Sequence, residues 1–321
     1  MPSWQARVSN ALVRTIVRRR DWGNLAVLAR RARIVFGAPW PYQSLARVGL
    51  QVERVKNDTV RGEWIAPAAK ASGIVLYIHG GGFASCSAST HRPITCGLTR
   101  RTGLAVFAAN YRLAPEYRFP AALDDVAAAY EWLVREHPGV PIAISGDSAG
   151  GGLALSLAVR VRDTRLQKPS SVVLFSPWTD LAGRGASLHD NDGRDPMFRP
   201  ENIPAFARVY LGEVSADDPR ASPVYADLSE LPPVLLQVGS TELLLDDSRR
   251  VYDRIVATGG AARLTVYDRV HHGWQMLAPL VPESRAALGE AAEWLLAKGD
   301  RRIDARGATG RDVGSNRHHD A

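Results

Sequence analysis

Cysteine is scarce in this sequence, since only Cys86 and Cys96 occur among its 321 residues. Two cysteines cannot build a disulfide framework, and neither belongs to a CxxC pair or has a clustered histidine partner. The usual zinc-binding patterns are therefore missing. We expect both thiols to be structural, and we expect no metal site.

Long apolar runs are also lacking. Runs such as 74–78 and 172–175 have the length of strands, whereas a membrane-spanning helix needs about 18 apolar residues or more. The N-terminus has no apolar segment followed by a small-residue cleavage site, so no secretory signal is predicted. With 45% apolar and 23% charged residues, the composition excludes a disordered chain and predicts a cytoplasmic globular protein.

Lysine is missing from the first 50 residues, although they carry the excess of positive charge. They contain nine arginines and one acid, Asp21, and sum to +8, so the other 271 residues sum to −1 in a chain of net charge +7. A nucleic-acid-binding domain is therefore not expected, and the question of a charged partner concerns the N-terminal segment alone.

Large apolar residues recur at every fourth position near the N-terminus: Trp4, Val8, Leu12 and Ile16. This spacing predicts amphipathic helices over 4–18 and 22–35 with arginine-rich outer faces. Two interpretations remain open. The helices either cap the core of the protein, which we favour, or meet a membrane surface.

Short apolar runs alternate with helical stretches from residue 48 onward. Strands are expected at 48–55, 60–65, 74–78, 104–109, 142–144, 172–175, 234–238 and 264–267. Helices are expected at 121–136, 148–162, 246–258 and 283–297. The alternation predicts a mainly parallel, doubly wound α/β sheet. Residues 183–218 interrupt it and predict an inserted helical segment over the sheet, whereas the polar residues 299–321 predict a disordered tail.

Two glycine-rich segments point to chemistry. Gly146-Asp147-Ser148-Ala149-Gly150 fits the nucleophile elbow G-x-S-x-G and lies between a predicted strand and a predicted helix. His79-Gly80-Gly81-Gly82 follows strand 74–78, and its glycines allow backbone N–H groups to approach a developing oxyanion. Each pattern alone is also common in structural turns, but the two in this order favour a serine hydrolase.

A serine nucleophile needs an acid and a histidine, which in such a fold follow it in the loops after later strands. His271 and His272 follow the last predicted strand, and Glu242, Asp246 and Asp247 follow the strand before it. Glu242 lies in the loop at the carboxyl edge of the sheet. The two aspartates lie where the next helix begins, a position at which carboxylates commonly satisfy free N–H groups.

Together with the segment 111–124, these motifs resemble the hormone-sensitive-lipase-like family of carboxylesterases, the bacterial family IV, over about residues 45–298. The resemblance places the acid in a D-x-L-x-D segment, onto which Glu242–Asp246 falls, and the base in an H-G-F or H-V-F segment, onto which His272–Trp274 falls. Glu242 stands where the family more often has aspartate. Arg112 and Glu116 are expected to support the floor of the site through an ion pair.

The resemblance implies an α/β-hydrolase fold with a mobile cap. The cap would consist of residues 1–45 and the insertion at 183–218, and the catalytic domain would span 46–298. Ser148 is expected to attack the ester carbonyl, His272 to act as base and Glu242 to orient it, while N–H groups of Gly81, Gly82 and Ala149 bind the oxyanion.

The expected substrates are small-molecule esters with short to medium acyl chains, and neither a metal nor an organic cofactor is needed. A lipase for long acyl chains is an alternative within the same class. A receptor that binds a small molecule and a membrane-binding module are alternatives without catalysis, and the presence of His272 argues against both. The sequence predicts no particular oligomeric state.

Overall fold

The protein folds around a single eight-stranded sheet in the computed structural model, which describes residues 1–19, 25–37 and 44–297. The predicted tail at 299–321 lies outside the described residues, as do residues 22–24 of the second predicted helix. The strands are β1 (Gln51–Lys56), β2 (Arg61–Ala66), β3 (Ile74–Ile78), β4 (Ala105–Ala109), β5 (Ile142–Asp147), β6 (Val172–Phe175), β7 (Val234–Gly239) and β8 (Ala262–Tyr267). All eight lie where the sequence predicts them, with ends that differ by at most three residues.

The strand order is β1-β2-β4-β3-β5-β6-β7-β8. Strand β2 runs antiparallel to both β1 and β4, and all pairs from β4 to β8 are parallel. The predicted mainly parallel sheet is therefore confirmed. Every residue of β3, β4, β5, β6 and β7 is buried, because helices cover both faces of the sheet; this explains why these strands appear as continuous apolar runs.

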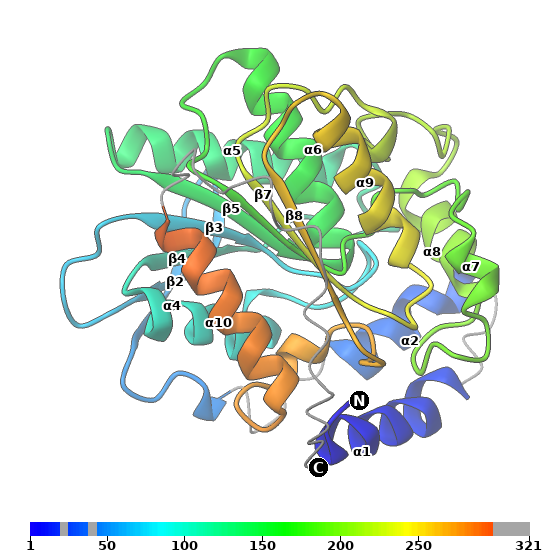
Figure 1. Cartoon of the computed structure of the whole chain (residues 1–321). Helices are drawn as coiled ribbons and strands as arrows, with labels where there is room; N and C mark the ends of the chain where they lie inside the picture. The colour runs from blue at the N-terminus through cyan, green and yellow to red at the C-terminus, as the bar shows by residue number, and fades with distance from the viewer. Residues whose placement is uncertain (20–24, 38–43, 298–321) are drawn as a thin grey trace, which may run out of the picture.

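Helices α5 (Ala121–Glu136), α6 (Ser148–Thr164) and α9 (Leu245–Ala257) cover one face, and α4 (Arg92–Thr102) and α10 (Pro282–Leu296) cover the other (Figure 1). Strand β3 contributes side chains to the hydrophobic core on each face of the sheet. Its Ile74, Leu76 and Ile78 pack with the α5 and α6 side, whereas Val75 and Tyr77 pack with α4 and α10. This alternation follows from the two-residue period of a strand.

Helix α4 is not predicted from the sequence. Its residues RPITCGLTRRT include a proline, a glycine and three threonines, which are weak helix formers. The helix forms because Ile94, Cys96 and Leu98 are buried in the core beneath the sheet, so tertiary packing outweighs the low intrinsic propensity.

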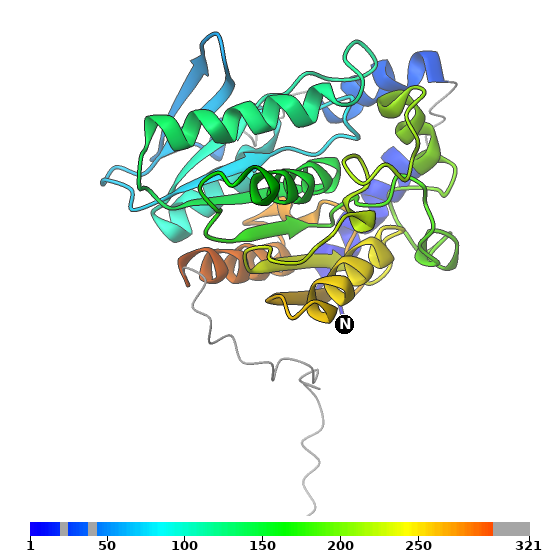
Figure 2. The same ribbon diagram turned by 90° about the horizontal axis from the view of Figure 1, so that it is seen from above.

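The carboxyl ends of the parallel strands point to one end of the molecule. There they meet helix α2 (Leu25–Phe36) and the predicted insertion, which contains α7 (Ser187–Asp190) and α8 (Asn202–Leu211) (Figure 2). Of the aromatic residues that suggested a helical piece, Phe206 and Tyr210 are buried on α8. None of the helices within the described ranges is long and apolar enough to cross a bilayer.

Helix α1 (Trp4–Val13) and the π-helical turn η1 (Arg14–Arg18) lie at the edge of the molecule. The sequence predicts that arginines occupy the outer face of this segment and that its apolar face turns inward. Arg7 and Arg19 are exposed, but the prediction is wrong for the large apolar side chains, which are exposed as well. Trp4, Val8, Leu12 and Ile16 are 64%, 49%, 56% and 48% exposed. The segment attaches instead through small or short side chains such as Ala6 and Val17, which are buried, and through polar contacts on the same face.

Candidate active site

Ser148 occupies the turn between β5 and α6. Its φ of 53° lies in the left-handed region, which is strained for a residue with a side chain and is the geometry of a nucleophile elbow. The flanking glycines allow the tight turn, because a Cβ on Gly146 would collide with the carbonyl of Gly150, and a Cβ on Gly150 with the carbonyl of Ile78. The half-buried serine therefore faces a cavity at the N-terminus of α6.

Glu242 and His272 are joined by a hydrogen bond of 2.7 Å between Oε2 and Nδ1. The other carboxylate oxygen, Oε1, accepts hydrogen bonds from Ser176 Oγ at 2.7 Å and from the Gly239 N–H at 2.6 Å. The Glu242 side chain is fully buried and His272 nearly so. The carboxylate is therefore held in one orientation, and the added length of glutamate is accommodated at the end of β7.

The pKa of His272 is raised above its usual value of 6.5. Burial acts to lower it, but the charge of Glu242 and its hydrogen bond favour the protonated ring and outweigh burial, with smaller contributions from Asp195 and Asp147. The arrangement stabilises an imidazolium, which is the form that a general base takes after accepting a proton.

His271 is also buried, but its Nδ1 lies 2.8 Å from the carbonyl oxygen of His272 and contacts no carboxylate within the described residues. Of the two adjacent histidines, His272 alone is bonded to Glu242.

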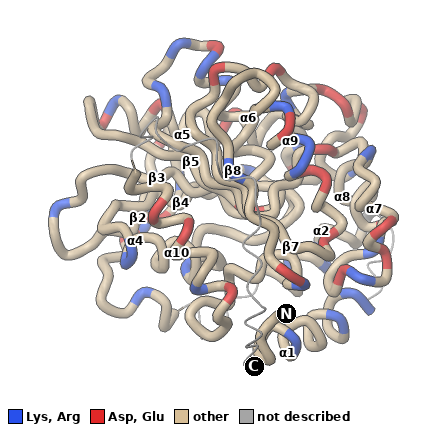
Figure 3. Tube along the Cα trace, viewed as in Figure 1, with Lys and Arg blue, Asp and Glu red and all other residues tan. Residues whose placement is uncertain are grey.

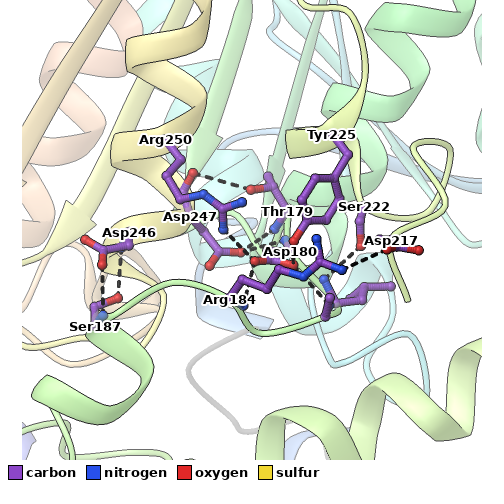
Figure 4. Close-up of polar contacts among 12 residues, drawn as sticks. Thr179, Asp180, Arg184, Ser187, Asp217, Ser222, Tyr225, Asp246, Asp247 and Arg250 are labelled. Atoms are coloured by element: carbon purple, nitrogen blue, oxygen red, sulfur yellow. Dashed lines mark hydrogen bonds and ion pairs between the residues drawn. The ribbon is translucent and has the colours of Figure 1, made fainter. Parts of the chain in front are cut away.

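Asp246 and Asp247 fasten the start of α9 to the loop after β6 (Figure 4). Asp246 accepts a hydrogen bond of 2.8 Å from the N–H of Ser187. Asp247 is buried and accepts hydrogen bonds from the N–H groups of Thr179 at 2.7 Å and Asp180 at 2.8 Å. Burial, together with the charge of Asp180, raises the pKa of Asp247 to about 8. Neither carboxylate has a hydrogen bond to a histidine in the part of the chain that the structure describes.

The glycine loop after β3 lies against the elbow. Gly81 and Gly82 line the same cavity as Ser148, and their φ values of 114° and 60° lie in the region that favours glycine. Ala149 follows Ser148 in the first turn of α6, where N–H groups have no helical partner. Backbone donors from both segments are thus available near the serine.

Asp147 connects these two segments and is nearly fully buried. It accepts hydrogen bonds from the Gly80 N–H at 2.9 Å and the Tyr77 hydroxyl at 2.7 Å, and His91 Nε2 lies 3.1 Å from its other oxygen. Neither Tyr77 nor His91 is predicted in this role from the sequence. Tyr77 reaches the elbow through the parallel pairing of β3 and β5, and His91 reaches it from the turn η2 (Ala88–His91).

His79 packs behind the loop. Its ring stacks on Tyr111 at 4.3 Å, and the Tyr111 hydroxyl donates to the carbonyl oxygen of His79 at 2.8 Å. Burial, reinforced by the charge of nearby His91, lowers the pKa of His79 to about 3, so the ring is neutral at physiological pH. Its contacts position the loop, and His79 is not among the residues that line the cavity.

Asp195 is a buried carboxylate near Glu242 that was not predicted from the sequence. It comes from the insertion, and its Oδ2 accepts a hydrogen bond of 2.9 Å from the N–H of Leu243, next to Glu242. Its Oδ1 accepts from the N–H groups of Met197 at 2.6 Å and Phe198 at 3.1 Å. Burial raises the pKa of Asp195. Since the Phe198 ring packs edge-on against His272 at 5.3 Å, this one carboxylate holds segments on both sides of the histidine.

The cavity has a volume of about 220 Å³. Its wall is mainly apolar, with side chains from α2, the insertion and the loop after β8: Phe36, Trp178, Met197, Phe198, Ile203, Phe206, Leu244, Met276 and Leu277. Ser148 and His272 supply polar groups at the same wall. Such a surface suits the apolar part of a small ligand with one reactive polar group. No group of side chains able to hold a metal ion occurs among the described residues.

The expected ion pair between Arg112 and Glu116 is wrong. Arg112 pairs with Asp125 at 2.8 Å, and Glu116 pairs with Arg33 of α2 at 2.6 Å. The arginine on α2 also donates to the carbonyl oxygens of Ala84 and Ala114. The segment around Glu116 therefore anchors α2 near the cavity, a long-range contact that sequence spacing does not reveal.

Comparison with known proteins agrees with this arrangement. A family model described as alpha/beta hydrolase fold matches residues 75–276. An acetyl-hydrolase from Streptomyces hygroscopicus is 37% identical over 234 residues, which cover 73% of this chain and 78% of that protein. An esterase from Acinetobacter venetianus is 36% identical over 247 residues, covering 76% and 82% of the two chains.

The fold is also shared with solved structures. The crystal structure of an esterase from the bacterial hormone-sensitive lipase family matches with a TM-score of 0.84 and 36% identity, over 93% of this chain and 99% of that one. Sequence identity and fold thus agree over most of both chains, and this protein belongs to the α/β hydrolases, within the hormone-sensitive-lipase-like family of carboxylesterases.

Proposed function

We propose that Ser148, His272 and Glu242 are the catalytic triad of this carboxylesterase. Ser148 Oγ attacks the ester carbonyl while His272 Nε2 accepts its proton, and Glu242 stabilises the resulting imidazolium. The tetrahedral intermediate collapses to an acyl-enzyme, and His272 returns the proton to the departing alcohol. Water activated by the same histidine then releases the acid and regenerates the serine. The 2.7 Å hydrogen bond between Glu242 and His272, in the wall of the cavity that Ser148 lines, carries this proposal.

The oxyanion is bound by the N–H groups of Gly81, Gly82 and Ala149. Donors of this kind are effective because they are already oriented when charge develops on the carbonyl oxygen. The positive φ of both glycines supports the assignment, because a loop of this shape turns successive N–H groups toward one point.

The substrates are esters with a short to medium acyl chain. The cavity of about 220 Å³ is smaller than the roughly 300–1,000 Å³ typical of pockets for drug-sized ligands, and its apolar lining fits an acyl group. The names of the acetyl-hydrolase and esterase relatives agree with small esters. Helices α2 and α8 supply Phe36 and Phe206 to the wall, which supports a cap made of the N-terminal segment and the insertion.

Labelling with a fluorophosphonate tests the triad. We expect one phosphonyl group on the peptide that carries Ser148, and neither labelling nor ester turnover in Ser148→Ala. Ser145→Ala is the matched control, because this serine lies on β5, three residues before Ser148, and its hydroxyl is buried without a hydrogen-bond partner among the described residues. A folded Ser148→Ala variant that still hydrolysed esters would exclude the proposal.

An ester series of increasing acyl length tests the substrate class. We expect kcat/KM to be highest for short and medium chains and to fall once the acyl group exceeds the cavity. A maximum at long chains would favour the lipase alternative. Labelling without turnover of any ester would favour a protein that has retained the triad but acts mainly in binding.

A further inference from the structure

The outer face of α1 is apolar, which is unusual for a surface helix. Trp4, Val8 and Leu12 follow one another at four-residue intervals and are 64%, 49% and 56% exposed; we call them the α1 stripe. Side chains four residues apart lie on the same side of a helix, so the three form one continuous strip. Ile16 continues the same spacing into η1. Single exposed apolar residues are ordinary, but an aligned row on one helix marks an interaction surface.

The orientation of the helix is specified by contacts on its opposite side. Ser3 bonds to Glu283 through both its N–H and its hydroxyl, and Asn10 donates to the carbonyl oxygen of Arg269 at 2.7 Å. Farther along, Arg14 donates to the carbonyl oxygen of Gly193 at 3.0 Å. These polar contacts, together with buried Ala6, fix the face that meets the protein and leave the α1 stripe in water. Contact between these apolar side chains and water is unfavourable, and burying them against a partner would remove that cost in free energy.

Positive charge borders the α1 stripe. Arg7 lies between Trp4 and Val8 in the chain and Arg19 follows η1; both are exposed, and Figure 3 shows the basic residues along this helix. The first 50 residues sum to +8, whereas the rest of the chain is close to neutral. An apolar row with an indole at one end and arginines beside it matches the chemistry of a lipid–water interface, where the tryptophan lies among head groups and arginines meet anionic lipid.

We propose that the α1 stripe docks on the surface of an anionic lipid bilayer, with Trp4, Val8 and Leu12 entering the head-group region and Arg7 and Arg19 pairing with phosphates. A second copy of the chain is a less suitable partner for the α1 stripe, because two such segments facing each other would bring their positive charges together. The C-terminal residues 298–321 are also a poor match for the stripe. They contain more basic than acidic residues and only two large aliphatic ones, Ile303 and Val313.

The docked face adjoins the proposed site. Arg18 of η1 donates to the carbonyl oxygens of Asp195 and Phe198, and Phe198 lines the cavity. Contact with a membrane would thus bring the cavity near a supply of apolar esters. The docking itself needs no catalysis, so it can be tested apart from the triad.

Co-sedimentation with vesicles is the test. The full chain is mixed with vesicles of phosphatidylglycerol and phosphatidylcholine, or of phosphatidylcholine alone. We expect sedimentation with the anionic vesicles, which weakens as salt is added. The variant Trp4→Ser/Val8→Ser/Leu12→Ser should partition at least about tenfold less, because it loses most of the buried apolar area. Val256→Ser is the matched control, since it removes an exposed apolar side chain from α9 and should bind as the wild type does.

A second variant tests the charge. Arg7→Gln/Arg19→Gln should bind anionic vesicles several-fold more weakly and show a smaller dependence on salt. Both variants should hydrolyse a water-soluble acetate ester at the wild-type rate, because none of the changed residues lines the cavity, and this rate also reports that they are folded.

Three outcomes would overturn the proposal. The first is a wild-type protein that stays in the supernatant with anionic vesicles, and the second is a stripe variant that binds them as well as the wild type does. The third is a dimer that forms without lipid and is abolished by the stripe variant in analytical ultracentrifugation, which would assign the stripe to a second copy.

Discussion

Glu242 and His272 lie 30 residues apart in the chain, and their side chains meet through a hydrogen bond of 2.7 Å in the interior of the protein. Strands β7 and β8 are neighbours and parallel, so the loops after them emerge side by side. Ser176 and the Gly239 N–H occupy the second carboxylate oxygen, and this leaves the first for the histidine alone.

Removing the charge of Glu242 tests its role. Glu242→Gln keeps the size of the side chain but removes the carboxylate that selects the histidine tautomer, so kcat should fall about 10³- to 10⁴-fold. Steady-state kinetics on a short ester measures this loss.

Asp246→Asn is the control for Glu242→Gln. This carboxylate bonds to Ser187 and not to a histidine, so its removal should lower the free energy of unfolding by about 1 kcal/mol and leave kcat nearly unchanged. The reverse pattern, with an active Glu242→Gln and an inactive but folded Asp246→Asn, would exclude Glu242 as the acid.

The pH dependence of activity follows from the raised pKa of His272. The ring must be neutral to accept the proton of Ser148, so kcat/KM should increase as pH rises through this pKa, with its acid midpoint above pH 6.5. Because the charge of Glu242 is a cause of the upward shift, the residual activity of Glu242→Gln should show a midpoint at lower pH. A wild-type midpoint well below 6.5 would contradict the assignment of His272 as base.

Gly82→Val tests the oxyanion loop. The φ of Gly82 is 60°, which strains any residue with a side chain, and a Cβ there would lie 2.7 Å from the ring of Phe206, so the ring or the loop must shift. Loss of one aligned donor should reduce kcat by roughly 10² or more. Gly103→Val is the control, because that glycine has a similar φ of 68° but nothing within 4 Å and ends α4 away from the cavity. Equal losses in both variants would mean that general instability, and not the loop, is responsible.

Asp195→Asn tests the buried carboxylate from the insertion. An amide cannot accept hydrogen bonds on both sides, so an N–H of Leu243, Met197 or Phe198 loses its partner, at a cost of about 1–3 kcal/mol. We expect a lower kcat and a lower acid midpoint in the pH profile, because Asp195 contributes to raising the pKa of His272.

Asp192→Asn is the control for this variant. Asp192 lies in the same segment, but its side chain is exposed and pairs with Arg18 at 2.6 Å. Because solvent screens this surface ion pair, its loss should leave the free energy of unfolding and the pH profile nearly unchanged. An Asp195→Asn variant with an unchanged pH midpoint would reduce the role of Asp195 to stability alone.

The fold itself was predictable from the sequence. Apolar runs such as 74–78 become fully buried strands because local composition and burial require the same structure there. The order of glycine loop, elbow serine, acidic loop and histidine loop also follows from the chain, since parallel strands deliver the segments after them to one edge of the sheet. Such features depend on local pattern and chain order, both of which the sequence contains.

The choice among neighbouring candidates depended on the tertiary structure. Spacing left Glu242, Asp246 and Asp247 as candidate acids, and the fold directs only the first to His272. Asp195 and His91 join the site from distant segments. Arg112 and Glu116 are four residues apart but do not pair with each other. Arg112 pairs with Asp125 on α5, and Glu116 pairs with Arg33 on α2.

The sequence by itself determined that residues 4–18 form an amphipathic helical segment, but it did not determine which face turns inward. Periodicity records which side chains share a face and carries no information on what each face meets. The answer comes from Ser3, Asn10 and Arg14. Their partners are Glu283 in the first turn of α10 and the loop residues Arg269 and Gly193, which come near only when the sheet has formed. Those long-range polar contacts fix the rotation of the helix, and for this reason only the tertiary structure decides that Trp4, Val8 and Leu12 face the solvent.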